Sequence, residues 1–168
     1  MAVETMAKSR VVLQQCLSAR LQIQPETDET PAKHVEINRG LVVYVCFLKD
    51  ATEDMLDKMV KSVLMARLSD GGGDGKRVSI LDLPGDVLII PQATLGGILK
   101  GKMMQYHKNI DKETGLKLYT KFVEMCEQSL TENSKIKGVD VCVKSGTYGN
   151  RQVFSCSTNG PYSHIIEF

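Results

Sequence analysis

Residues 40–48 read Gly-Leu-Val-Val-Tyr-Val-Cys-Phe-Leu, and this stretch decides the fold. Nearly every side chain in it is apolar, and most are β-branched or aromatic, which is typical of a strand buried on both faces. In the next segment, residues 50–68, apolar side chains recur every three and four positions, which predicts an amphipathic helix. Asp50 or Thr52 supplies its start signal, and the glycine-rich residues 69–75 end it.

Outward from this strand and helix, the patterns predict mostly strands. Strands are expected over 10–16, 19–23, 78–81, 86–90, 139–143, 152–157 and 162–168, with a polar loop over 24–33. The strands at 78–81 and 86–90 are expected to pair across the Pro84-Gly85 turn. A second amphipathic helix is expected over 112–130, with Leu116, Tyr119, Phe122, Val123, Cys126 and Leu130 on its apolar face. Strands outnumber helices in mixed order, so we expect an α+β fold in a single domain over 1–168.

The composition is that of an ordinary globular chain. The 168 residues include 21 basic and 20 acidic residues, so the net charge is +1. Aromatic residues make up 5% and tryptophan is absent, which argues against an RNA binder built on rows of stacking aromatics. No apolar run approaches the roughly 20 residues that span a bilayer. The five cysteines contain no C-x-x-C pair, so we expect free thiols, no zinc knuckle and a cytoplasmic location.

Standard catalytic motifs are missing. The run Gly71–Lys76 superficially resembles a phosphate loop, but Asp70 and Arg77 occupy positions where that loop requires Gly and Ser or Thr. The histidines at 34, 107 and 164 are far apart and have no metal-ligand spacing. No nucleophile elbow is present. We therefore expect neither a metal nor a cofactor.

One window is strongly basic. Between Lys100 and Lys121 there are six lysines against Asp111 and Glu113, a local balance of +4. The window is either a solvated surface or a contact for nucleic-acid phosphates, which needs only point charges near the backbone. Its candidate tRNA-binding residues are Lys100, Lys102 and Lys108.

Two segments carry a specific resemblance. Residues 91–95 read Pro-Gln-Ala-Thr-Leu after an apolar strand, and residues 159–161 read Asn-Gly-Pro before the last strand. Together they resemble the two motifs of the D-aminoacyl-tRNA deacylase family, typically Ser-Gln-Phe-Thr-Leu-Tyr-Ala and Asn-x-Gly-Pro-Val-Thr. This chain departs from them at Pro91, Ala93 and Gly96-Gly97 in the first motif, and at Tyr162-Ser163 after the Gly-Pro pair of the second. These variants are similar to those of the animal-specific branch of that family.

The resemblance implies an enzyme that hydrolyses the ester at the 3′ end of a mischarged tRNA. It implies a homodimer of mixed β-sheets or a barrel, with Gly160 and Pro161 inserted across the interface. It assigns the reaction to Gln92, Ala93 and Thr94, with backbone N–H groups near Ala93 and Thr94 stabilising the oxyanion and the ribose 2′-hydroxyl of the RNA taking part. Without the resemblance, Gln92 and Thr94 read as polar residues that cap the end of a strand, with their side chains on one face.

Selectivity is implied to depend on Gly160 and Pro161, supported by Asn159 and by Gln15, which stands where the family has an arginine. A trans Gly-Pro bond would turn two carbonyl groups away and admit L-alanine on threonine tRNA, besides D-aminoacyl and glycyl esters. The alternative within the class is a strictly D-selective deacylase. The alternative from another class is a tRNA-binding module that leaves the ester intact.

Overall fold

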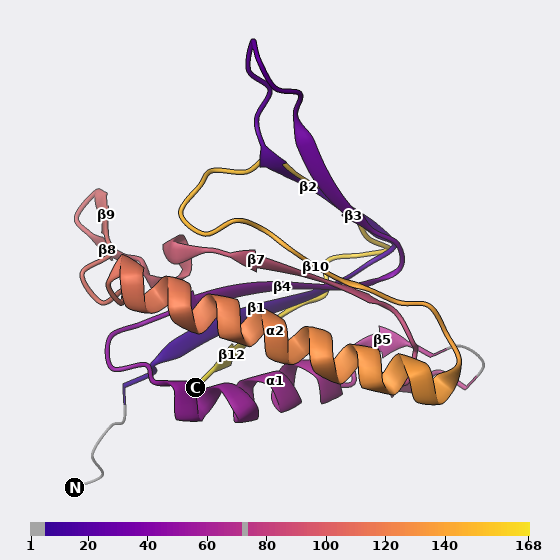
Figure 1. The fold of residues 1–168 in the computed structure, drawn as a ribbon. Helices are drawn as coiled ribbons and strands as arrows, with labels where there is room; N and C mark the ends of the chain where they lie inside the picture. The colour runs from indigo at the N-terminus through magenta and orange to yellow at the C-terminus, as the bar shows by residue number, and fades with distance from the viewer. Residues whose placement is uncertain (1–5, 72–73) are drawn as a thin grey trace, which may run out of the picture.

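The computed structural model describes residues 6–71 and 74–168, drawn in Figure 1. The helices are α1 (Leu56–Met65) and α2 (Lys112–Lys137), together with two short 3-10 helices, η1 (Glu53–Met55) and η2 (Ala93–Gly96). The strands are β1 (Ser9–Cys16), β2 (Ser18–Gln24), β3 (Lys33–Ile37), β4 (Gly40–Phe47), β5 (Ser69–Asp70), β6 (Arg77–Val78), β7 (Asp86–Pro91), β8 (Ile98–Lys100), β9 (Met103–Gln105), β10 (Val143–Ser145), β11 (Phe154–Ser157) and β12 (Ser163–Glu167). This is the α+β class that the sequence predicts.

The central sheet has the strand order β10-β7-β4-β1-β12, so β4 lies in its middle. Strand β4 runs antiparallel to β1 and parallel to β7. Leu41 and Val43 point to a core that contains both helices, whereas Val42 points to the opposite core beneath β2 and β3. The prediction of a strand buried on both faces is therefore confirmed. In Figure 1 both helices lie along one side of the sheet, and the β2–β3 pair projects toward the top of the view, away from them.

Both helices differ in length from the prediction. Helix α2 extends seven residues beyond Leu130, because Gly138 ends it in the left-handed region at a φ of +67°. Its expected apolar face is buried except for Leu116, which is 47% exposed, while Leu118 is buried. Helix α1 is shorter than 50–68, since Thr52 precedes η1 and Ala66, which follows the helix, has an extended backbone.

Several strand predictions need correction. The hairpin expected from 78–81 and 86–90 is wrong, because β6 pairs with β5 and β7 pairs with β4. Residues 80–84 form turns instead. The polar segment 24–33 is a loop only from Pro25 to Ala32, and the strand β3 that follows it was not predicted. The strand expected over 139–143 is wrong except for its last residue, because β10 spans Val143–Ser145, and the last two strands are shorter than expected.

No helix in the described ranges has the length and apolar character that a bilayer span requires. All five cysteines are free thiols.

Candidate active site

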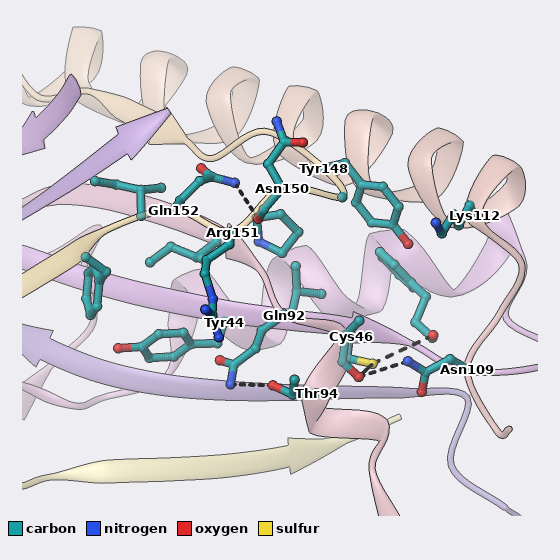
Figure 2. Close-up of a pocket in the computed structure, with 18 of the residues that line it drawn as sticks. Tyr44, Cys46, Gln92, Thr94, Asn109, Lys112, Tyr148, Asn150, Arg151 and Gln152 are labelled. Carbon is teal, nitrogen blue, oxygen red and sulfur yellow. Dashed lines mark hydrogen bonds between the residues drawn. The ribbon is translucent and has the colours of Figure 1, made fainter. Parts of the chain in front are cut away.

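A cavity of about 720 Å³ opens where β4 and β7 end and η2 begins (Figure 2). Four aromatic residues supply much of its apolar wall: Tyr44, Phe47, Tyr148 and Phe154. Its polar side chains come from separate segments of the chain: Gln92, Thr94, Asn109, Lys112, Asn150, Arg151 and Gln152. Of the residues predicted from sequence to carry the reaction, Gln92, Ala93 and Thr94 all line this cavity.

The floor of the cavity is a short turn rather than an extended strand. Strand β7 ends when the N–H of Gln92 donates to the Val45 carbonyl at 2.9 Å, and residues Ala93–Gly96 then form η2. The extended conformation predicted for Thr94 is therefore wrong. Gln92 and Thr94 nevertheless lie together, because the Gln92 side-chain amide donates to the Thr94 hydroxyl at 2.9 Å.

Two backbone donors are left free by this turn. The first N–H groups of a helical turn have no partner within it. Within the described part of the chain, the N–H groups of Ala93 and Thr94 find no acceptor, whereas those of Leu95 and Gly97 donate to carbonyls three residues earlier. Two adjacent free donors on a cavity wall can stabilise negative charge that develops on a substrate oxygen.

The carbonyl groups of the turn are held from outside it. Asn109 donates from Nδ2 to the Ala93 carbonyl at 2.9 Å, and Arg10 donates from Nη1 to the Leu95 carbonyl at 2.6 Å. The Cys46 thiol lies 3.7 Å from the Ala93 carbonyl, and burial raises its pKa. Burial also raises the pKa of the Tyr148 phenol. Near neutral pH these two groups are protonated, so neither is an anionic nucleophile.

The residues predicted to set substrate selectivity lie outside this cavity. Gly160, Pro161, Gln15 and Asn159 are absent from the residues that line the cavity, and the first two lie in the loop between β11 and β12. Gly160 has a φ of +152°, a region that side chains with a Cβ rarely adopt. Within the described residues, the cis bond is the one between Leu83 and Pro84, and the Gly160-Pro161 bond is trans. The Gly160 carbonyl accepts from the Thr158 hydroxyl at 2.9 Å.

Gln14, which sequence reasoning missed, brackets this loop. Its Nε2 donates to the Gln15 carbonyl at 2.6 Å and to the Thr158 hydroxyl at 3.1 Å. Its Oε1 accepts from the Tyr162 N–H at 3.2 Å and from the Ser163 hydroxyl at 2.8 Å. Gln15 adds one contact, from Nε2 to the Asn159 side-chain oxygen at 2.8 Å. The sequence signal for Gln14 is only its polarity in an apolar strand, where its side chain is 7% exposed.

The short β5–β6 pair lies against the same loop. The Arg77 guanidinium stands 4.6 Å from the centre of the Tyr162 ring and pairs with the Asp70 carboxylate. Asp70 also accepts from the Asn159 amide at 3.4 Å. The loop is therefore contacted from β1 on one side and from the β5–β6 pair on the other.

The predicted tRNA-binding lysines lie beside the cavity rather than in it. Lys100 and Lys102 are exposed on the β8–β9 hairpin, which projects at the end of the molecule where α2 begins (Figure 1). Lys108 is half-buried, and its carbonyl accepts from the Lys49 N–H at 2.8 Å. Two other cations line the cavity itself. Lys112 belongs to the basic window but was not among its predicted contacts, and Arg151 lies outside that window and was missed.

Metal ligands are not gathered anywhere in residues 6–71 and 74–168, where no group of three or more His, Cys, Asp or Glu side chains could hold an ion. The ring of His164 contacts that of Tyr162, with centroids 4.5 Å apart. The glycine run at 71–76, considered above as a phosphate loop, lies partly outside the described residues.

Comparison with known proteins gives one consistent match. The family model described as D-Tyr-tRNA(Tyr) deacylase matches residues 12–167. The D-aminoacyl-tRNA deacylase 2 of Homo sapiens is 56% identical over 161 residues, which cover 96% of this chain and 95% of that protein. Its counterpart in Gallus gallus is 56% identical over 160 residues, with 95% of each chain covered. A solved structure, described as a probable eukaryotic D-amino acid tRNA deacylase, superposes with a TM-score of 0.80 at 26% identity, covering 95% of this chain and 99% of that one.

Proposed function

The chain belongs to the D-Tyr-tRNA(Tyr) deacylase family, and from this premise we propose that it is a proofreading enzyme that hydrolyses the ester of mischarged aminoacyl-tRNA. We propose that the whole chain, residues 1–168, acts as one such domain. Its substrates would be D-aminoacyl, glycyl and L-alanyl esters, the last on threonine tRNA. Homologues that share its sequence over nearly the full length carry the name of the first of these activities.

The observation that carries the proposal is the pair of free N–H groups on Ala93 and Thr94 at the wall of a cavity. An aminoacyl ester is already activated, so its hydrolysis needs a placed water and a stabilised oxyanion rather than a triad. In the proposed mechanism, water attacks the ester carbonyl while these two donors bind the oxygen that becomes negative. The 2′-hydroxyl of the terminal ribose assists proton transfer, and Thr94 lies beside the ester with Gln92 orienting its hydroxyl.

Relaxed chirality is the finer part of the proposal. It is supported by the trans Gly160-Pro161 bond and by the Gly160 carbonyl, which accepts from the Thr158 hydroxyl of its own loop. Ala93 adds to this, because it stands where the family motif has phenylalanine and so leaves more room beside the ester. A strictly D-selective enzyme would instead need carbonyl groups directed at the position of an L side chain.

We propose a homodimer in which the loop of Gly160 and Pro161 enters the partner's cavity. The edge position of β12 supports this, since that strand has a neighbour on one side in the sheet order and carries Ile165 with 67% of its surface exposed. Mixing a Thr94→Ala subunit with a Pro161→Ala subunit tests the shared site. Mixed dimers then contain one site with both wild-type parts and should exceed the activity of either parent, whereas equal activity would argue for sites within one subunit.

The tRNA end would approach over the β8–β9 hairpin, where Lys100 and Lys102 are exposed. From there, the acceptor phosphates could reach Lys112 and Arg151 at the cavity itself. Only a local group of cations is needed to bind the end of an RNA, which agrees with a net charge of +1. We expect this activity in the cytoplasm, where free thiols persist.

A deacylation time course tests the proposal. Purified protein is added to L-alanyl-tRNA(Thr), glycyl-tRNA and a D-aminoacyl-tRNA, and the remaining ester is measured against a buffer control. Hydrolysis of all three supports relaxed chirality. Hydrolysis of the D-aminoacyl ester alone would identify the D-selective alternative. Binding of tRNA without hydrolysis of any ester would identify the non-catalytic alternative.

A further inference from the structure

The turn that carries the two free donors is fastened by a residue outside both motifs. Asn109 lies in the irregular segment between β9 and α2, where its N–H donates to the Tyr106 carbonyl at 3.0 Å and its backbone forms a bridge with Leu48. From this fixed backbone, its Nδ2 reaches the Ala93 carbonyl at 2.9 Å (Figure 2). Its Oδ1 is buried and has no hydrogen-bond partner among the described residues.

The Asn109 amide fits only because position 96 is glycine. A Cβ placed on Gly96 would lie 1.8 Å from the Asn109 Oδ1 and 2.8 Å from its Cγ, far inside van der Waals contact. The family motif typically has tyrosine where this chain has Gly96. The departure at that position therefore makes the space that the Asn109 side chain occupies.

The bond to Ala93 controls one of the free donors directly. The Ala93 carbonyl and the Thr94 N–H belong to one planar peptide unit and point in opposite directions. Holding the oxygen on the Asn109 side therefore holds the Thr94 N–H on the other side. If the carbonyl were released, the peptide unit could rotate about its flanking bonds and turn the donor away from the substrate oxygen.

We propose that Asn109 is a positioning residue for ester hydrolysis, which fixes the peptide unit between Ala93 and Thr94 so that its N–H faces the reacting carbonyl. This inference rests on the proposed deacylase function and adds a residue to it. Asn109 need not touch the ester. Its loss should lower kcat rather than raise KM, because the donor acts mainly on charge that develops in the transition state.

The sharpest variant is Asn109→Asp, which keeps the shape and replaces the donor by a carboxylate oxygen. At pH 8 that oxygen repels the Ala93 carbonyl, and we expect kcat to fall by about tenfold or more, as misplaced catalytic groups do. A protonated carboxyl can donate again, and its pKa is raised where it is buried beside a carbonyl oxygen. The ratio of the variant's kcat to that of wild type should therefore rise as pH falls from 8 to 5.

Asn133→Asp is the matched control. Asn133 also donates from Nδ2 to a backbone carbonyl, that of Leu81, at 2.9 Å. It lies 21 residues further along α2 than Lys112, about 30 Å away at 1.5 Å per residue. This control should lose stability without a change in kcat or a pH-dependent recovery, so it separates positioning from general destabilisation.

A double-mutant cycle tests the same contact from its other side. Gly96→Ala should expel the Asn109 amide and reproduce the lower kcat, and the pair Gly96→Ala with Asn109→Ala should cost little more than either change alone. Three results would overturn the proposal. They are a kcat in both Asn109 variants that matches that of wild type, additive losses of activity in the cycle, or a change in KM alone. If wild type cleaves no ester, the proposed function fails, and the backbone conformation at Thr94 in Asn109→Ala, read by NMR from its amide nitrogen shift and its HN–Hα coupling, decides the positioning role. Values equal to those of wild type would overturn it.

Discussion

Replacing Gln14 by leucine tests whether one buried side chain holds the loop of Gly160 and Pro161. Leucine fills a similar volume but removes all four side-chain hydrogen bonds of Gln14, three of which reach the loop or its flank at Thr158, Tyr162 and Ser163. Each such bond contributes about 1 kcal/mol net, which sets an upper value near 4 kcal/mol. Thr158 and Ser163 are exposed and can bond to water instead, so we expect a loss of about 2–4 kcal/mol in the free energy of unfolding.

The assay is urea denaturation at one fixed protein concentration, because association would shift the apparent stability. Gln15→Leu is the control, since the Gln15 side chain makes one bond to another exposed side chain and should cost less than about 1 kcal/mol. The same variants are then compared in the ratio of L-alanyl to D-aminoacyl hydrolysis, which should change more for Gln14→Leu. Equal stability losses at the two positions would refute the reasoning that Gln14 is the main support of the loop.

Three further predictions follow from the site. Thr94→Ala should lower kcat by less than about tenfold, because one neutral hydrogen bond is worth about 1 kcal/mol; a fall to the uncatalysed rate in single-turnover assays would assign its hydroxyl a chemical role. Lys100→Ala with Lys102→Ala should raise KM and reduce the slope of log affinity against log salt by about two, and an unchanged slope, matching Lys135→Ala, would remove the hairpin from the tRNA contact. Hydrogen bonds from the Thr114 N–H and hydroxyl lower the pKa of the Asp111 carboxyl, so the stability it adds is present above its unfolded pKa and is lost as pH falls through the lower folded value. Wild type should therefore be more stable than Asp111→Asn in thermal melts at pH 7, and the difference should shrink as pH falls below the pKa of the unfolded carboxyl; a difference unchanged in acid would contradict this origin.

Local patterns predicted the parts of the fold that local forces determine. The strand at 40–48 was confirmed because burial on both faces requires an unbroken apolar run, and α2 was found from its spacing of apolar residues. The hairpin expected around Pro84 was wrong for the complementary reason. Which strand β7 pairs with depends on β4, more than 40 residues earlier, and a turn signal does not encode a distant partner.

The candidate site shows the same limit. Gln92, Ala93 and Thr94 were predicted because they form one contiguous motif, and all three line the cavity. Asn109 and Gln14 were missed because their importance lies in contacts across 16 and up to 149 residues of chain. A single polar residue in an apolar strand or a loop does not show which carbonyl it will reach.

The contacts of β12 have a consequence for the order in which the protein is made. The chain leaves the ribosome from its N-terminus, so the turn at Ala93–Gly96 emerges well before the loop at Gly160. That loop is fixed only when β12 docks on β1, across 149 residues between Gln14 and Ser163. Such long-range pairing is slow. A nascent chain therefore carries its proposed hydrolytic turn before it carries its proposed means of choosing a substrate, and both functions coincide only once the last strand is in place.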